Sequence, residues 1–250
     1  MTRAIKVGQG ATLKLGDGAY ANYYYMGAGQ NGNAINVEQS GRLEFGDAIG
    51  QIDGFRVDGK FANGGGACTV FPKTENHDFS DDVYMRGAAI FGAGAYHVDG
   101  SFHLTAGGAE CEEDAPAIWG DDVTMVISGR TVPASSSAFG CDSSAYCLDG
   151  GQAIRLVAPT SGPNTGMGVI GPIGPGQGGG YISAGGSSRL SGVMYFPNDP
   201  IKLDGGASLG GSSETDCLQI VGSEVTMDGG PSVASECIDT SGGGRISMVR

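Results

Sequence analysis

Two pairs of adjacent acids come nearest to a catalytic pattern: Asp81-Asp82 and Asp121-Asp122. Enzymes that cleave glycosidic bonds use two carboxyl groups that converge on one bond. Each pair here directly precedes a strand-like run, VYM or VTMVI, and neighbouring residues of a strand point to opposite faces. We therefore expect these acids to belong to turns, and the sequence assigns no catalytic residue.

Two histidines are the next candidates. His97 and His103 each lie between two apolar residues of an alternating run, YHV and FHL. In a strand the middle residue faces away from its two neighbours, so both imidazoles should lie outside, in solvent. Glutamates at positions 110, 112 and 113 follow nearby and raise a metal site as the alternative. We expect solvated histidines and no bound metal.

Two further segments resemble binding motifs. Residues 27–32 read GAGQNG and match the G-x-G-x-x-G pattern of dinucleotide-binding loops. Such a loop must open a helix, whereas the next residues, NAINVEQSG, alternate like a strand, so no cofactor is expected. The run Tyr23, Tyr24 and Tyr25 is a candidate partner surface, because alternation exposes at least one ring; packing in the core or at an edge is the alternative.

These residues must be positioned by a short unit that recurs along the chain, apolar-x-apolar-Asp-Gly. It occurs at residues 55–59 (FRVDG), 96–100 (YHVDG), 146–150 (YCLDG), 201–205 (IKLDG) and 225–229 (VTMDG). Each unit turns two apolar side chains to one face of a strand. Asp-Gly then ends the strand, because Asp caps a turn and Gly adopts positive φ.

The spacing of these units indicates a solenoid. Other short alternating runs lie between the units, and an imperfect period of about 20–50 residues built from short strands is typical of stacked coils. We predict a single all-β domain over residues 1–250, a right-handed parallel β-helix with inserted loops. A β-sandwich of antiparallel hairpins is the alternative, because Asp-Gly also forms hairpin turns.

This fold places a defined set of side chains in the core. The residues expected inside are Ile201, Leu203, Val225, Met227, Val123, Met125, Ile127, Ile154 and Leu156. The longest glycine-free window, residues 67–86, is interrupted by Pro72 and is expected to be a loop with at most one helical turn. Residues 111–119 and 131–147 are expected to form inserted loops.

The six cysteines are predicted to form three disulfides. Their wide spacing lacks the C-x₂-C pairs of zinc sites and favours an oxidising compartment. The expected pairs are Cys217–Cys237, which lie about one coil apart, Cys141–Cys147, which closes a local loop, and Cys68–Cys111, assigned by elimination.

Composition limits the partners. The chain has 14 basic and 27 acidic residues, a formal net charge of −13, which disfavours nucleic acid and anionic membrane surfaces. Of its 250 residues, 48 are glycine, but without a Gly-X-Y period that would indicate collagen. No apolar run approaches the roughly 20 residues of a membrane span, and nothing resembles a signal peptide. We expect a mature region or an excised domain.

Several longer stretches follow one another in a distinctive order. They are YHVDGSFHLTAGG, DDVTMVISG, RLVAPTSG, SGVMYFP and CLQIVGSEVTMDGG, the last followed by a cysteine. Over roughly residues 90–250 this order resembles the C-terminal glycine-rich region of TadG-like proteins of the tight-adherence (Flp) pilus machinery. The chain departs from that family in its long inserts and in lacking the N-terminal membrane anchor of full-length members.

The resemblance implies an exported bacterial protein, periplasmic or on the cell surface, whose anchor is missing from this chain. It implies a minor pilus component or adhesin, with pilus proteins, envelope proteins or surface glycans as partners, and it implies no catalytic residues. Two other functions remain open. A polysaccharide-active enzyme would show convergent acids in a cleft or bound Ca²⁺, and a passive structural domain would bind nothing.

Overall fold

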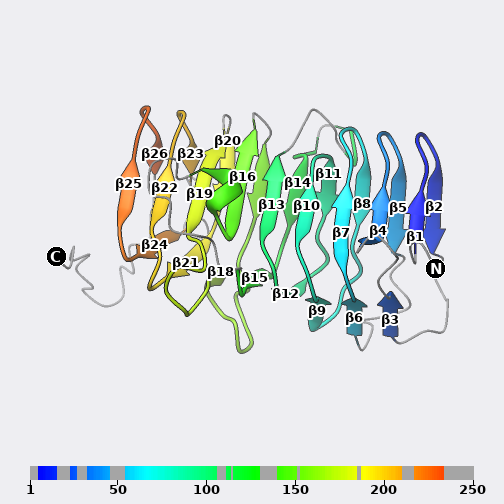
Figure 1. Ribbon diagram of the computed structural model, residues 1–250, viewed down its shortest axis with the longest axis horizontal. Coiled ribbons are helices and arrows are strands. Elements are labelled where there is room, and N and C mark those ends of the chain that lie inside the picture. The colour runs from blue at the N-terminus through cyan, green and yellow to red at the C-terminus, as the bar shows by residue number, and fades with distance from the viewer. Residues whose placement is uncertain are drawn as a thin grey trace.

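The computed structural model describes residues 5–15, 23–26, 33–45, 54–105, 111–113, 115–129, 140–150, 153–184, 187–209 and 217–233. Within these residues the regular structure consists of β-strands and one short 3-10 helix, η1 (Cys141–Ser143), with no α-helix. The strands form three long sheets, and within each sheet they follow one another along the length of the molecule (Figure 1).

Among the described residues, the strands of each sheet lie side by side in chain order. The first sheet contains β1 (Ile5–Val7), β4 (Asn33–Val37), β7 (Lys60–Asn63), β10 (Val83–Met85), β13 (Phe102–Thr105), β16 (Tyr146–Gly150), β19 (Gly180–Ala184), β22 (Ile201–Leu203) and β25 (Val225–Met227). The second contains β2 (Thr12–Leu15), β5 (Arg42–Phe45), β8 (Cys68–Val70), β11 (Ala88–Ile90), β14 (Ile118–Gly120), β17 (Ile154–Leu156), β20 (Ser187–Leu190), β23 (Ser208–Leu209) and β26 (Ser232–Val233). The third contains β3 (Tyr23–Met26), β6 (Gly54–Val57), β9 (Asn76–Phe79), β12 (Gly94–Val98), β15 (Val123–Ile127), β18 (Met167–Ile170), β21 (Gly192–Phe196) and β24 (Leu218–Gly222).

The chain visits the three sheets in turn. Three consecutive strands contribute one strand to each sheet, and the next three pair beside them in parallel, as β1 does with β4 and β4 with β7. The strands thus follow chain order from one end of the molecule to the other (Figure 1). This recurrence is compatible with a parallel β-helix. The described strands do not form the alternative, a β-sandwich of antiparallel hairpins, because their pairings are parallel.

Strand register aligns the inward side chains into rows, as expected for stacked coils. One row of the first sheet consists of Ile5, Ile35, Phe61, Val83, Phe102, Tyr146, Gly180, Ile201 and Val225. Seven of the nine residues expected inside are buried, namely Ile201, Leu203, Val123, Met125, Ile127, Ile154 and Leu156.

Two of the expected core residues are not buried. Val225 is 43% exposed and Met227 is 49% exposed. Both lie on β25, the last strand of the first sheet among the described residues, so strand β22 covers them on one side only. The prediction was wrong for these two because strand alternation gives the direction of a side chain and not the number of coils stacked around it.

Three expected loops contain strand residues. Residues 67–86 form β8, β9 and β10, with Pro72 at the corner between the first two, where no ladder hydrogen bond is required of its nitrogen. The expected insert 111–119 ends inside β14, and the expected insert 131–147 ends inside β16. Most of that second insert, residues 131–139, lies outside the described residues.

Candidate functional site

The candidate site is built on the corners between the second and third sheets. Phe71 is the first residue after β8, and Phe91 is the first residue after β11. Both rings are buried, and they stack with centroids 5.3 Å apart and an interplanar angle of 17°. Each buried phenylalanine contributes about 1.5–3 kcal/mol relative to leaving it in water. The pair therefore anchors the start of the two corners that carry Lys73 and Ala93, two residues further along the chain.

The corner after β11 permits only small residues. A Cβ on Gly92 would overlap the Pro72 carbonyl, and one on Gly94, whose φ is +143°, would overlap the Thr74 carbonyl oxygen. The backbone closes this contact, because the Thr74 N–H donates to the Ala93 carbonyl at 3.2 Å. The Gly94 N–H donates in the same way to the carbonyl of the residue in front of β15, at 3.0 Å. One coil with short side chains thus lies between two coils with longer ones.

Two adjoining depressions open beside this corner and share Lys73 and Ala93. We call the first, about 590 Å³, the Trp119 groove; Val70, Ile90 and Trp119 line its floor, and Lys14, Glu44 and Asp121 also line it. We call the second, about 510 Å³, the Asn76 groove; its polar lining includes Thr74, Glu75, Asn76, Asp122, Ser161 and Asn164.

The floor of the Trp119 groove is the outward row of the second sheet. Register places Val70 beside Ile90, Ile90 beside Trp119, and Trp119 beside Arg155. Trp119 is half-buried, and its Nε1 is buried without a hydrogen-bond partner in the structure. The part of the indole that reaches the groove is therefore carbon.

Three of the charged side chains that line the Trp119 groove, Lys14, Glu44 and Asp121, take part in ion pairs. Lys14 Nζ lies 3.5 Å from Glu44 Oε2, and Arg155 Nη1 lies 2.7 Å from Asp121 Oδ1. A hydrogen bond from Arg42 holds the pKa of Glu44 below its ordinary value, and the charges of Arg42 and Lys14 act in the same direction against partial burial. The groove therefore presents paired donors and acceptors around an apolar floor.

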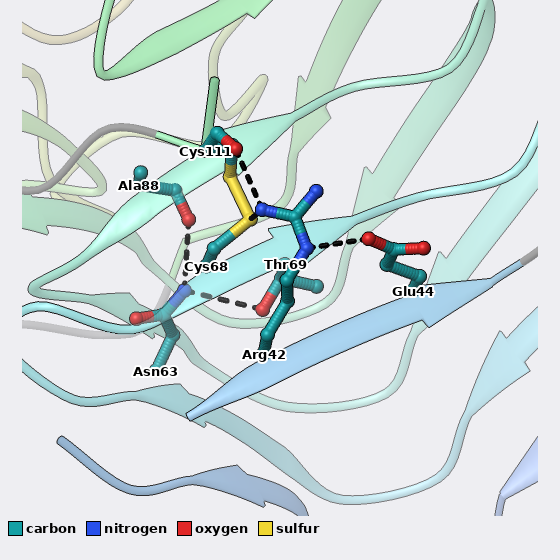
Figure 2. The surroundings of a disulfide bond; sticks show 7 residues. All are labelled: Arg42, Glu44, Asn63, Cys68, Thr69, Ala88 and Cys111. Carbon is teal, nitrogen blue, oxygen red and sulfur yellow. Dashed lines mark hydrogen bonds and ion pairs between the residues drawn. A yellow bond between two sulfur atoms is a disulfide. The ribbon is translucent and has the colours of Figure 1, made fainter. Parts of the chain in front are cut away.

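A disulfide clamp forms the neighbouring part of the same face (Figure 2). Cys68 and Cys111 are bonded, with Cα atoms 5.2 Å apart, and the bond holds the segment at Cys111 against the second sheet. Arg42 Nη1 donates to the Cys111 carbonyl at 2.6 Å, and its Nε pairs with Glu44 (Figure 2). Asn63 Nδ2 donates to Thr69 Oγ1 at 3.1 Å and to the carbonyl of a residue on β11 at 3.0 Å. The clamp thus orients Glu44 on the rim of the groove.

The two acid pairs occupy the corners in front of β10 and β15, as expected for turn residues. Asp82 is 1% exposed; its Oδ1 accepts from the Ser101 N–H at 2.9 Å, so its role is to hold two coils together. Asp121 and Asp122 are exposed and border different grooves. Asp122 adopts a left-handed φ of 59°, which short polar residues tolerate better than most.

The histidines behave differently from one another. His97 is half-buried on the outer side of β12, with Nε2 3.3 Å from Asn76 Oδ1. The prediction of a solvated imidazole was wrong for His103, which is only 5% exposed. It does lie in an outward row, but Cys147 is its register partner and its Nε2 donates to the Ser144 carbonyl at 2.9 Å, so the loop before β16 covers it.

The remaining candidates from the sequence are the metal site, the tyrosine run and the glycine-rich motif. Among the described residues, no cluster of three or more His, Cys, Asp or Glu side chains is placed to hold a metal ion. The backbone of Tyr23, Tyr24 and Tyr25 forms most of β3, but the side chains of this candidate partner surface lie outside the described residues, as do residues 27–32. Glu112 and Glu113 are exposed.

The disulfide predictions are confirmed where the structure describes them. Besides the clamp, Cys141 and Cys147 are bonded, with Cα atoms 5.1 Å apart. Cys217 is also disulfide-bonded, but its expected partner, Cys237, lies outside the described residues.

The grooves are the feature that sequence reasoning missed. Their signal in the sequence was Phe-Pro-Lys at 71–73 and Phe-Gly-Ala-Gly at 91–94, two corners that begin with a buried phenylalanine and differ in side-chain size.

Comparison with known proteins does not identify a ligand for the grooves, because no family model, no curated protein and no solved structure matches the chain. In the described part of the chain, no helix has the length and apolar character needed to cross a bilayer.

Proposed function

We propose that this protein is a non-catalytic, exported binding module, a right-handed parallel β-helix that serves a bacterial tight-adherence pilus system as an adhesion component at the cell surface. The resemblance of residues 90–250 to TadG-like proteins supplies the pilus context. The observation that carries the binding role is the pair of adjoining grooves, which share Lys73 and Ala93 on a rigid stack of coils. Binding sites are usually concave, with an apolar floor and a few polar groups.

The acids of the grooves support binding rather than bond cleavage. A glycosidase needs two carboxyl groups facing each other across the scissile bond, one of them kept protonated by its surroundings. Asp121 is exposed and paired with Arg155, and Asp122 forms the turn that leads into β15. The carboxylate of Glu44 is tied to Arg42 and Lys14.

The disulfides and the charge support export. Two closed disulfides are described, and such bonds persist in oxidising compartments. A formal charge of −13 keeps a secreted domain soluble and disfavours nucleic acid as a partner.

Two experiments test the proposal. Deleting this region from the gene of its parent protein should reduce pilus-dependent attachment of the bacteria, and envelope fractions should contain the region together with pilus or envelope proteins. Attachment that is unchanged by the deletion would refute the adhesion role. The purified chain should release no reducing ends from polysaccharides. Release that disappears in Asp121→Asn or Asp122→Asn would establish the enzyme instead.

A further inference from the structure

The chemistry of the two grooves points to one class of ligand. Resting on the proposed function, we infer that the Trp119 groove and the Asn76 groove together bind a neutral oligosaccharide. One sugar ring lies on the indole of Trp119, and the oligosaccharide continues past Ala93 into the Asn76 groove. No residue of the chain is required to react with it.

The floor suits the apolar face of a sugar. Trp119 presents carbon to the groove, because its Nε1 is buried, and Val70 and Ile90 extend this apolar floor along the sheet. The C–H face of a sugar ring placed on an indole buries apolar area on both partners. Parallel strand pairing on both sides holds this row in register, so the apolar floor is preformed. Little conformational entropy is therefore lost on binding.

The walls suit the hydroxyl rim. Lys73 lies one coil before Ala93, and Asp121-Asp122 lie one coil after it. Neighbouring strands are about 4.8 Å apart, so the backbones of the two walls are about 10 Å apart. This gap admits one chain of sugar rings. Side chains at its edges, including Asn76 and Ser161, offer both donors and acceptors.

The charges favour a neutral ligand. The four charged side chains that line the Trp119 groove, Lys14, Glu44, Lys73 and Asp121, sum to zero. The Asn76 groove adds Glu75 and Asp122, which are negative. An acidic glycan would meet these carboxylates on a protein whose net charge is already −13, and like charges at an interface are repulsive.

An extended peptide fits this site less well. Peptides that lie along a sheet bind by adding a strand to a free edge. Strand β11, which carries Ile90, is paired on one side with β8 and on the other with β14, so its backbone groups are already used. Recognition at the grooves must therefore come from side chains and ring faces.

The chain carries its own probe for this test. Trp119 is its only tryptophan, so intrinsic emission reports on the groove directly. We expect at least one of a panel of neutral hexasaccharides, tested at up to millimolar concentration, to shift or quench this emission with saturation. The hexasaccharide of galacturonic acid should not. Calorimetry with the same sugars gives the affinities independently.

A matched pair of substitutions locates the binding. Ala93→Phe fills the point where the grooves meet and should weaken binding at least tenfold. Ala62→Phe places the same ring on the outer side of β7 in the first sheet, away from both grooves, and should leave affinity unchanged. Far-UV circular dichroism checks that both variants are folded. Trp119→Ala, measured by calorimetry, should also lose at least tenfold and provides the test if Ala93→Phe does not fold.

Each contrary result has a separate meaning. No saturable response to any neutral sugar, equal losses in Ala93→Phe and Ala62→Phe, or equally tight binding of the acidic sugar overturns the neutral-oligosaccharide inference. If beads coated with the chain still adhere to surfaces while neutral sugars neither bind nor compete, the ligand class is wrong and the binding module stands. Release of reducing ends from a bound sugar would instead overturn the non-catalytic function.

Discussion

His77 should make the stability of the protein depend on pH. The ring is fully buried in the third sheet and stacks on Tyr96 with centroids 3.8 Å apart. Burial lowers the pKa of His77 from 6.5 to about 3; the carbonyl of Pro72, which accepts from Nε2 at 2.8 Å, opposes this shift, and the nearby His97 adds to it. The folded protein therefore keeps the imidazole neutral where the unfolded chain binds a proton.

Proton linkage gives the sign and size of the change in unfolding free energy with pH. Because the pKa is depressed on folding, the stabilisation is fully present above pH 6.5 and is lost as the pH falls towards 3. Each unit of pH in that window costs about 1.4 kcal/mol, so His77 alone should remove about 2.6 kcal/mol between pH 7.5 and pH 4.5. His77→Phe keeps a ring in place and removes the titrating group.

Urea unfolding at several pH values measures this effect. The variant should be less stable than the wild type at pH 7.5, because the Pro72 carbonyl loses its donor, but should lose about 2.6 kcal/mol less on acidification. Phe55→Leu is the matched control, since Phe55 is the register partner of His77 on β6 and does not titrate. It should lower stability equally at both pH values. Parallel pH profiles for the wild type and His77→Phe would refute the reasoning.

Three further changes test other parts of the fold. Leu203→Ala should cost about 3 kcal/mol in urea unfolding, whereas its exposed register partner Met227→Ala should cost less than about 1; equal losses would mean that the last described strand is covered in solution. Gly94→Ala should cost more than about 2 kcal/mol by the same assay, because its φ and the Thr74 carbonyl both exclude a Cβ, and a neutral effect would contradict the close packing of the corners. Replacing Cys68 and Cys111 together with Ala should lower stability by about 4 kcal/mol from lost loop closure over a separation of 43 residues; a loss under about 1 kcal/mol would show that the clamp does not constrain the unfolded chain.

The apolar-x-apolar-Asp-Gly units were predictable from the sequence, because their apolar residues alternate and an Asp-Gly turn signal follows them. Strands β6, β22 and β25 end directly before Asp-Gly, as the repeat requires. The unit at 146–150 departs from the rule, since β16 continues through Asp149 and Gly150. Asp-Gly permits a turn, but the neighbouring strand decides whether the ladder stops there.

The strands that the sequence did not reveal have polar or very short patterns. Strand β9 reads NHDF, and its inward residues are His77 and Phe79, so a search for alternating aliphatic residues passes over it. Strand β14 reads IWG, too short to show any period, and it carries Trp119. Burial of His103 also depends on a loop 41 residues away. Local periodicity contains no information about such a cover.

The grooves and the stability of the corner have a common physical origin. Gly92 and Gly94 are fixed by contact with the coil before them, so the corner after β11 has no room for larger residues at those places. Ala93 lies between them and lines both grooves. We therefore expect side-chain size at this single position to change the shape of the site. The neighbouring corners, with Lys73 on one side and Asp122 on the other, set the polarity of the walls. A coil scaffold of this kind separates the residues that maintain the fold from the few that select a ligand.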